Sequence, residues 1–152
     1  MFKLFSIEEA TRLLPFVDET LRDMQQAAQD VVTLRDQHSK LNAWSVGARN
    51  VAEEIKFLLS TLQGHKAELD RRGIQLRDIE TGVVDFPSRL GAEVVCLCWE
   101  QGEDAIAYYH RLNDDTTKRR PIEAHPQVTE TDAVLAQVVA QHEVPETPAT
   151  PS

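Results

Sequence analysis

The sequence predicts an α+β protein in which a long antiparallel helical hairpin packs on a small antiparallel β-meander of three or four strands. Apolar residues recur at heptad spacing over residues 6–72, and a period of two replaces that spacing over residues 74–112. Residues 123–152 then combine acidic residues and prolines with no lysine or arginine, which predicts a flexible acidic tail. A chain of 152 residues fits one α+β domain, residues 1–122, better than two domains.

The first helix is predicted to begin at a capping box formed by Ser6 and Glu9. Pro15 either ends this helix early or leaves its first turns on a longer, kinked helix. Beyond the proline, apolar residues follow at heptad steps of four and three, namely Val17, Leu21, Met24, Ala28 and Val31. A second heptad series consists of Val51, Ile55, Leu58, Leu62, His65 and Leu69. The short connector between the two series predicts that the helices fold back on each other as an antiparallel hairpin.

The meander is predicted from short runs rich in Val, Ile, Cys and aromatic residues, with turn signals between them. Its register depends on the turn around Gly102. A turn symmetric about Gly102 pairs Val94 with His110 and Cys98 with Ile106, whereas a two-residue turn shifts the pairing by one and sends His110 to the opposite face. The sequence leaves both registers open.

The tail contains one segment with helical spacing, residues 131–142, which predicts a short helix that is marginal alone. Residues 144–152 hold three prolines and little to bury, which is typical of disorder.

The net charge of −9 argues against sequence-independent nucleic-acid binding and against docking on an anionic membrane surface. Apolar runs stay well short of the roughly 20 residues that a membrane span needs, and the N-terminus lacks a signal-peptide core. Cys96 and Cys98 are separated by one residue, so a disulfide between them would close a strained ring. These features predict a cytoplasmic protein in a reducing compartment, without nucleic-acid or membrane partners.

Several motifs in their order and spacing resemble an uncharacterised prokaryotic family, domain of unknown function 2203. The resemblance covers roughly residues 2–122. It is carried by the stretch from Asp78 to Pro87, by Leu97-Cys98-Trp99 with Gly102-Glu103, by Tyr109-His110, by Arg120-Pro121, and by the opening Phe5 to Ala10 with Leu13-Leu14-Pro15. It implies a cytosolic bacterial protein with no assigned activity, and it marks Arg120 as a basic residue of the family signature.

The candidate ligand or metal residues are the polar side chains of the meander, namely Asp78, Glu80, Asp85, Cys98, Glu103 and His110. Carboxylates and an imidazole on one side of a sheet are suited to a divalent metal or to an acid–base pair. Structural roles compete with this interpretation. Asp85 can cap a turn, His110 can join an ion-pair network, and each cysteine can act as a small buried apolar residue.

The sequence therefore favours a non-catalytic interaction or oligomerisation module rather than an enzyme. Val32, Leu34 and Leu41 lie off the heptad stripe, and a two-helix hairpin leaves them uncovered, which predicts a homodimer through the hairpin. The alternative is a protein that binds a divalent metal or a small ligand, including a hydrolase, through the carboxylates and histidine of the meander.

Overall fold

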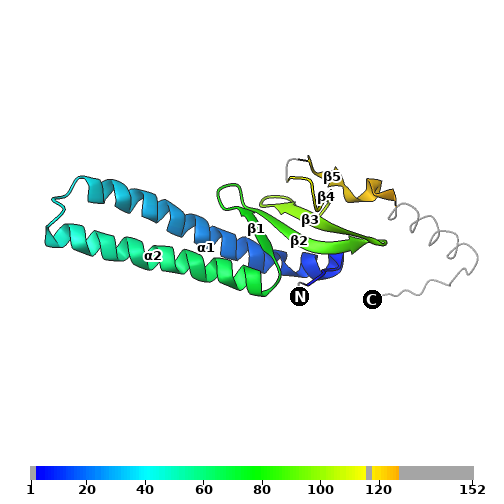
Figure 1. The fold of residues 1–152 in the computed structure, drawn as a ribbon, viewed down its shortest axis with the longest axis horizontal. Coiled ribbons are helices and arrows are strands. Elements are labelled where there is room, and N and C mark those ends of the chain that lie inside the picture. The colour runs from blue at the N-terminus through cyan, green and yellow to red at the C-terminus, as the bar shows by residue number, and fades with distance from the viewer. Residues whose placement is uncertain (1–2, 116–117, 127–152) are drawn as a thin grey trace, which may run out of the picture.

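Residues 3–115 and 118–126 are described by a computed structural model of the chain (Figure 1), and the predicted helix at 131–142 lies outside them. Two helices come first, α1 (Ile7–Ser39) and α2 (Val46–Arg71). The strands follow as β1 (Gln75–Asp78), β2 (Val83–Leu90), β3 (Glu93–Glu100), β4 (Tyr108–Arg111) and β5 (Arg120–Pro121), with a short 3₁₀ helix, η2 (Ile122–Ala124), after them. The predicted α+β class, with a helical hairpin preceding an antiparallel sheet, is confirmed.

The capping box at the start of α1 forms as predicted. The Ser6 side chain accepts a hydrogen bond from the Glu9 amide at 3.0 Å, and the Glu9 carboxylate accepts one from the Ser6 amide at 2.9 Å. The helix continues through Pro15 to Ser39, so the longer of the two predicted helices is the correct one. These two hydrogen bonds satisfy amides at the start of the helix that would otherwise lack a partner.

The two helices bury their heptad positions unequally. On α1, Val17, Leu21, Met24 and Val31 are buried. On α2, the buried residues are Ala48 and Leu69, while the remaining heptad positions are half-buried. The core cluster takes five buried residues from α1, Ala10, Leu14, Val17, Leu21 and Met24, and from α2 it takes Leu69. The sheet covers only the part of the hairpin near the start of α1, and the far part projects beyond it (Figure 1). None of the helices among the described residues is both long enough and apolar enough to cross a bilayer.

The described strands form one antiparallel sheet in the order β1-β2-β3-β4-β5. The meander was expected to end near residue 112 with three or four strands, and β5 extends the sheet beyond that point. This addition is stabilised where the Ile122 amide donates a hydrogen bond to the Ala107 carbonyl at 2.9 Å. The first residues of the expected tail therefore pack on the sheet, and His125 is buried there.

The register between β3 and β4 differs from both registers that the sequence left open. Cys96 pairs with His110, and Cys98 pairs with Tyr108. Relative to a turn symmetric about Gly102, the pairing is displaced by two residues, because the loop between the strands is longer. A displacement of two keeps each side chain on its face, so His110 stays on the face of Cys96 and Cys98 but gains a different partner.

The hydrophobic core lies between α1 and one face of the sheet. That face carries Val84 and Phe86 from β2, Val95, Leu97 and Trp99 from β3, and Tyr109 from β4. The segment before α1 closes the core, since Phe5 packs edge-on against Phe86 with ring centroids 5.3 Å apart. The residues that alternate with these core positions point to the second face of the sheet.

Candidate functional site

The second face of the sheet carries a buried polar row. Asp85 lies between two core residues of β2, Cys96 and Cys98 alternate with core residues of β3, and His110 follows Tyr109 on β4. The exposed fractions are 0% for Asp85 and 2% for both Cys96 and His110. A charged or titratable side chain this deeply buried is costly unless it has partners.

Asp85 is the centre of the row. Its Oδ2 atom accepts hydrogen bonds from Arg77 Nε at 2.6 Å and from His110 Nε2 at 2.8 Å. Its Oδ1 atom is also buried, and among the described residues it accepts from no nitrogen or oxygen donor. The carboxylate therefore has two strong partners on Oδ2, and its further contact is a weak hydrogen bond with the thiol of Cys98 on the paired strand.

The second ring nitrogen of His110 fixes where its protons lie. Nδ1 is 3.0 Å from the Arg111 carbonyl oxygen, which only accepts, so Nδ1 carries a proton. Nε2 faces the Asp85 carboxylate. Two lone pairs cannot face each other at 2.8 Å, so a proton or a cation must lie between the imidazole and the carboxylate.

Cys96 brings a thiol to the same place. One donor atom each from Asp85, Cys96 and His110 lie within 4.8 Å of one another. Burial raises the pKa of the Cys96 thiol, and the Asp85 carboxylate adds to the effect. Burial likewise raises the pKa of Cys98 to about 12, again with a contribution from Asp85. Both thiols are therefore protonated near neutral pH and are weak nucleophiles.

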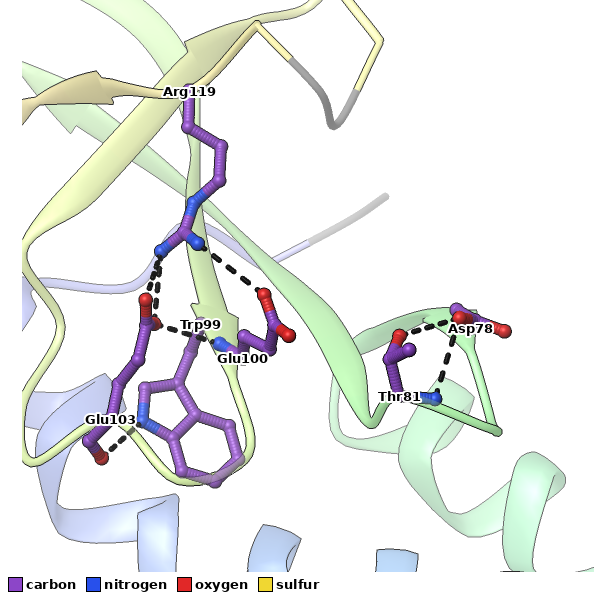
Figure 2. A network of polar contacts seen from close by, with 6 residues as sticks. All are labelled: Asp78, Thr81, Trp99, Glu100, Glu103 and Arg119. Atoms are coloured by element: carbon purple, nitrogen blue, oxygen red, sulfur yellow. Dashed lines mark hydrogen bonds and ion pairs between the residues drawn. The ribbon is translucent and has the colours of Figure 1, made fainter.

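Glu103 belongs to a separate network, which Figure 2 shows. Its carboxylate accepts hydrogen bonds from Arg119 Nη2, at 2.6 Å and 2.9 Å to its two oxygens, and from the Glu100 amide at 2.9 Å. The Trp99 indole donates to the Glu103 carbonyl at 3.1 Å. Arg119 also stacks over Tyr108, with its guanidinium 4.2 Å from the ring centre. This network fastens the loop after β3 to the segment before β5.

The remaining sequence-predicted residues lie apart from the row. Asp78 accepts hydrogen bonds from Thr81 in the turn after β1, on the other side of the view in Figure 2, and the Thr81 hydroxyl holds the pKa of Asp78 below its usual value. Glu80 is exposed in the same turn. Arg120 is exposed on β5 and lies 3.7 Å from Asp114. The structure thus brings together Asp85 and His110 of the predicted set, and leaves Asp78, Glu80, Glu103 and Arg120 elsewhere.

Cys96 and Arg77 complete the row, and neither was among the predicted site residues. Cys96 is two residues from Cys98 and so shares its face, which is a signal that the sequence offered. Cys98 pairs with Asp85 across the strands but lies outside the donor cluster. For Arg77 the sequence offers no comparable signal, because its contact depends on the irregular register between β1 and β2.

Comparison with known proteins gives one result that identifies the chain. Neither the curated proteins nor the solved structures provide a match. The model of the family described as "Uncharacterized conserved protein (DUF2203)" matches residues 3–122, which include both helices, all the described strands and the polar row. The resemblance seen in the sequence motifs is thereby confirmed, and the chain belongs to the DUF2203 family.

Proposed function

We propose that this protein is a non-catalytic self-association module, in which the far part of the hairpin packs against the same part of a second copy. We call residues 28–62 the distal hairpin. The observation that carries the proposal is that the contact between the two helices is poorly buried in this segment, where Val31 and Ala48 are the buried residues. Each helix presents one apolar stripe to the other, and a further pair of helices is needed to enclose both stripes.

The distal hairpin also gathers exposed apolar side chains. Of the eight exposed large hydrophobic residues in the described part of the chain, six belong to it, namely Val32, Leu41, Trp44, Val46, Phe57 and Leu59. Trp44 is 91% exposed and Phe57 is 69% exposed. Val46 and Phe57 lie eleven residues apart, which is three helical turns, so they share one face of α2. Such a concentration is typical of a protein–protein contact.

Charge favours a second copy as the partner. The distal hairpin contains four basic and four acidic residues, whereas the whole chain carries −9, so the excess negative charge lies outside this segment. Two copies can therefore bring their distal hairpins together without net repulsion, while the rest of each chain stays apart. The arrangement that follows is a two-fold symmetric bundle of four helices.

Hydrolysis at the sheet by a histidine base or a cysteine nucleophile has less support. Both ring nitrogens of His110 are engaged by oxygen atoms, so the imidazole has no free nitrogen with which to activate a water. Burial also raises the pKa of both thiols, which disfavours a cysteine nucleophile.

Light scattering after size-exclusion chromatography, at tens of micromolar protein, tests the proposal. The wild type should have the mass of a dimer, and the double variant Val46→Asp/Phe57→Asp should have the mass of a monomer with unchanged helical circular dichroism. Leu112→Asp is the matched control, because Leu112 is 57% exposed but lies outside the distal hairpin. A monomeric wild type, or a double variant that stays dimeric, would overturn the proposal. A control that dissociates would place the contact elsewhere.

A further inference from the structure

We propose that Asp85, Cys96 and His110 form a binding site for one zinc ion, which takes the place of the proton between the imidazole and the carboxylate. The proposal is independent of the self-association of the hairpin, since it concerns the opposite end of the molecule. Three features of the polar row support it: the kinds of donor, the hydrogen bonds behind them, and the unsatisfied carboxylate oxygen.

The donors are the types that zinc prefers. Zinc binds imidazole nitrogen and carboxylate oxygen at about 2.0–2.2 Å and thiolate sulfur at about 2.3 Å, so tetrahedral ligands lie roughly 3.3–3.8 Å apart. Here the three donor atoms lie within 4.8 Å of one another, and the imidazole nitrogen and carboxylate oxygen are 2.8 Å apart. Shifts of about 1 Å or less therefore bring all three to coordinating positions. Three ligands from adjacent strands leave the fourth position to a water.

The hydrogen bonds behind the donors orient them for a metal. A metal-binding histidine commonly donates its other ring proton to a backbone carbonyl, which fixes the tautomer and aims the remaining lone pair at the ion. His110 makes such a bond through Nδ1 to the Arg111 carbonyl, which leaves Nε2 as the ligand atom. Arg77 holds Oδ2 of Asp85 in place in the same way.

The Asp85 carboxylate supplies the second, separate observation. Within the part of the chain that the structure describes, Oδ1 accepts from no nitrogen or oxygen donor, on a side chain that is 0% exposed. An unsatisfied buried carboxylate oxygen calls for a positive partner. A zinc ion that is bound by both oxygens of the carboxylate gives Oδ1 a positive partner and keeps the contact between Oδ2 and the imidazole.

The charges also balance. When zinc binds, two protons leave to solvent: the Cys96 thiol proton as the bond between zinc and sulfur forms, and the proton between His110 and Asp85 as zinc bonds to the imidazole and the carboxylate. Zinc, one thiolate, one carboxylate and a neutral imidazole then have no net charge. The nearby Arg77 guanidinium therefore meets no net repulsion, and its partly exposed side chain, 43% accessible, lies between the buried carboxylate and solvent.

Titration of chelator-treated protein with zinc and with cobalt tests the site. The wild type should bind one equivalent of zinc and gain thermal stability. Its cobalt complex should show the charge-transfer absorption of a thiolate ligand. Cys96→Ser and His110→Gln should each weaken zinc binding at least 100-fold. Cys98→Ser should weaken zinc binding much less than Cys96→Ser, because Cys98 neighbours Asp85 on the same face but lies outside the donor cluster.

The outcomes separate clearly. A wild type that binds well below one equivalent, or whose cobalt complex lacks the thiolate absorption, overturns the proposal without any variant. Equal losses in Cys98→Ser and Cys96→Ser overturn the assignment of the ligands. The mass measured by light scattering should be the same with and without zinc, so failure of the zinc site and failure of the self-association proposal are distinguishable.

Discussion

Replacing Glu103 should loosen the connection between the loop after β3 and the segment before β5. The Glu103 carboxylate accepts from Arg119 Nη2 at 2.6 Å and from the Glu100 amide at 2.9 Å (Figure 2). Its side chain is 26% exposed and that of Arg119 is 21% exposed, so both ends of the ion pair are mostly shielded from water. Glu100 also approaches Arg119, but at 3.6 Å and with 45% of its side chain exposed.

The expected loss of free energy of unfolding follows from these contacts. Glu103→Ala removes three hydrogen bonds to a charged group, two from Arg119 Nη2 and one from the Glu100 amide, and leaves the guanidinium to the more distant Glu100 carboxylate. Hydrogen bonds to charged groups contribute about 1.5–3 kcal/mol, and partial exposure places this case near the lower part of that range. We expect Glu103→Ala to lower the free energy of unfolding by about 2 kcal/mol. Glu103→Gln keeps an acceptor for the amide and should cost about 1 kcal/mol. Glu100→Gln should cost less than about 0.5 kcal/mol, because exposed ion pairs contribute little.

Urea denaturation followed by far-ultraviolet circular dichroism measures these differences. All variants should be compared at one protein concentration, since self-association makes stability depend on concentration. We expect Glu103→Ala to lower the free energy of unfolding most, Glu103→Gln to lower it less and Glu100→Gln to lower it least. A cost below about 0.5 kcal/mol for Glu103→Ala, or a larger cost for Glu100→Gln, would show that the carboxylate does not hold the loop.

Two further predictions concern other parts of the sheet. Gly82 and Gly102 both have positive φ, 76° and 105°, but a Cβ on Gly82 would lie 2.4 Å from Gln101 Oε1, whereas one on Gly102 would meet nothing. Gly82→Ala should therefore lower the melting temperature more than Gly102→Ala, and equal shifts would contradict the steric argument. A hydrogen bond from His125 holds the pKa of Glu93 below its ordinary 4.5, so the stability that Glu93 contributes should be complete above that value and lost as pH falls below it. The melting-temperature gap between wild type and Glu93→Gln should shrink as the pH falls below 4.5, and a constant gap would refute this.

The helices could be predicted because their signals are local. The capping hydrogen bonds of Ser6 and Glu9 join residues three apart, and the heptad series places Leu21 and Leu69 on the stripes that are buried. Whether the helix ends at Pro15 could not be predicted, because this depends on whether packing stabilises the helix beyond the proline. The burial of Val17 and Leu21 against the sheet provides that stabilisation.

The strand register could not be predicted, because it depends on loop length between distant residues. Alternation placed His110 on the face of the cysteines, and this remained true because the register differs by an even number of residues. Alternation could not decide between Cys96 and Cys98 as the neighbour of His110. Likewise, nothing local indicates that His125 is buried, since its place follows from a 2.8 Å contact with Glu93 on β3.

The polar row differs from the apolar packing that stability alone favours. A buried ion pair contributes little on balance, because the cost of removing charges from water offsets their attraction, and apolar residues of similar volume often do as well. The row containing Asp85 departs from that economical solution, and in residues 3–115 and 118–126 no nitrogen or oxygen donor reaches one of its carboxylate oxygens. On the other face of the same strand, Val84 and Phe86 are buried in the ordinary apolar way. The zinc site proposed above accounts for this asymmetry between the two faces of β2, because a cation needs the carboxylate, thiol and imidazole that an apolar face lacks.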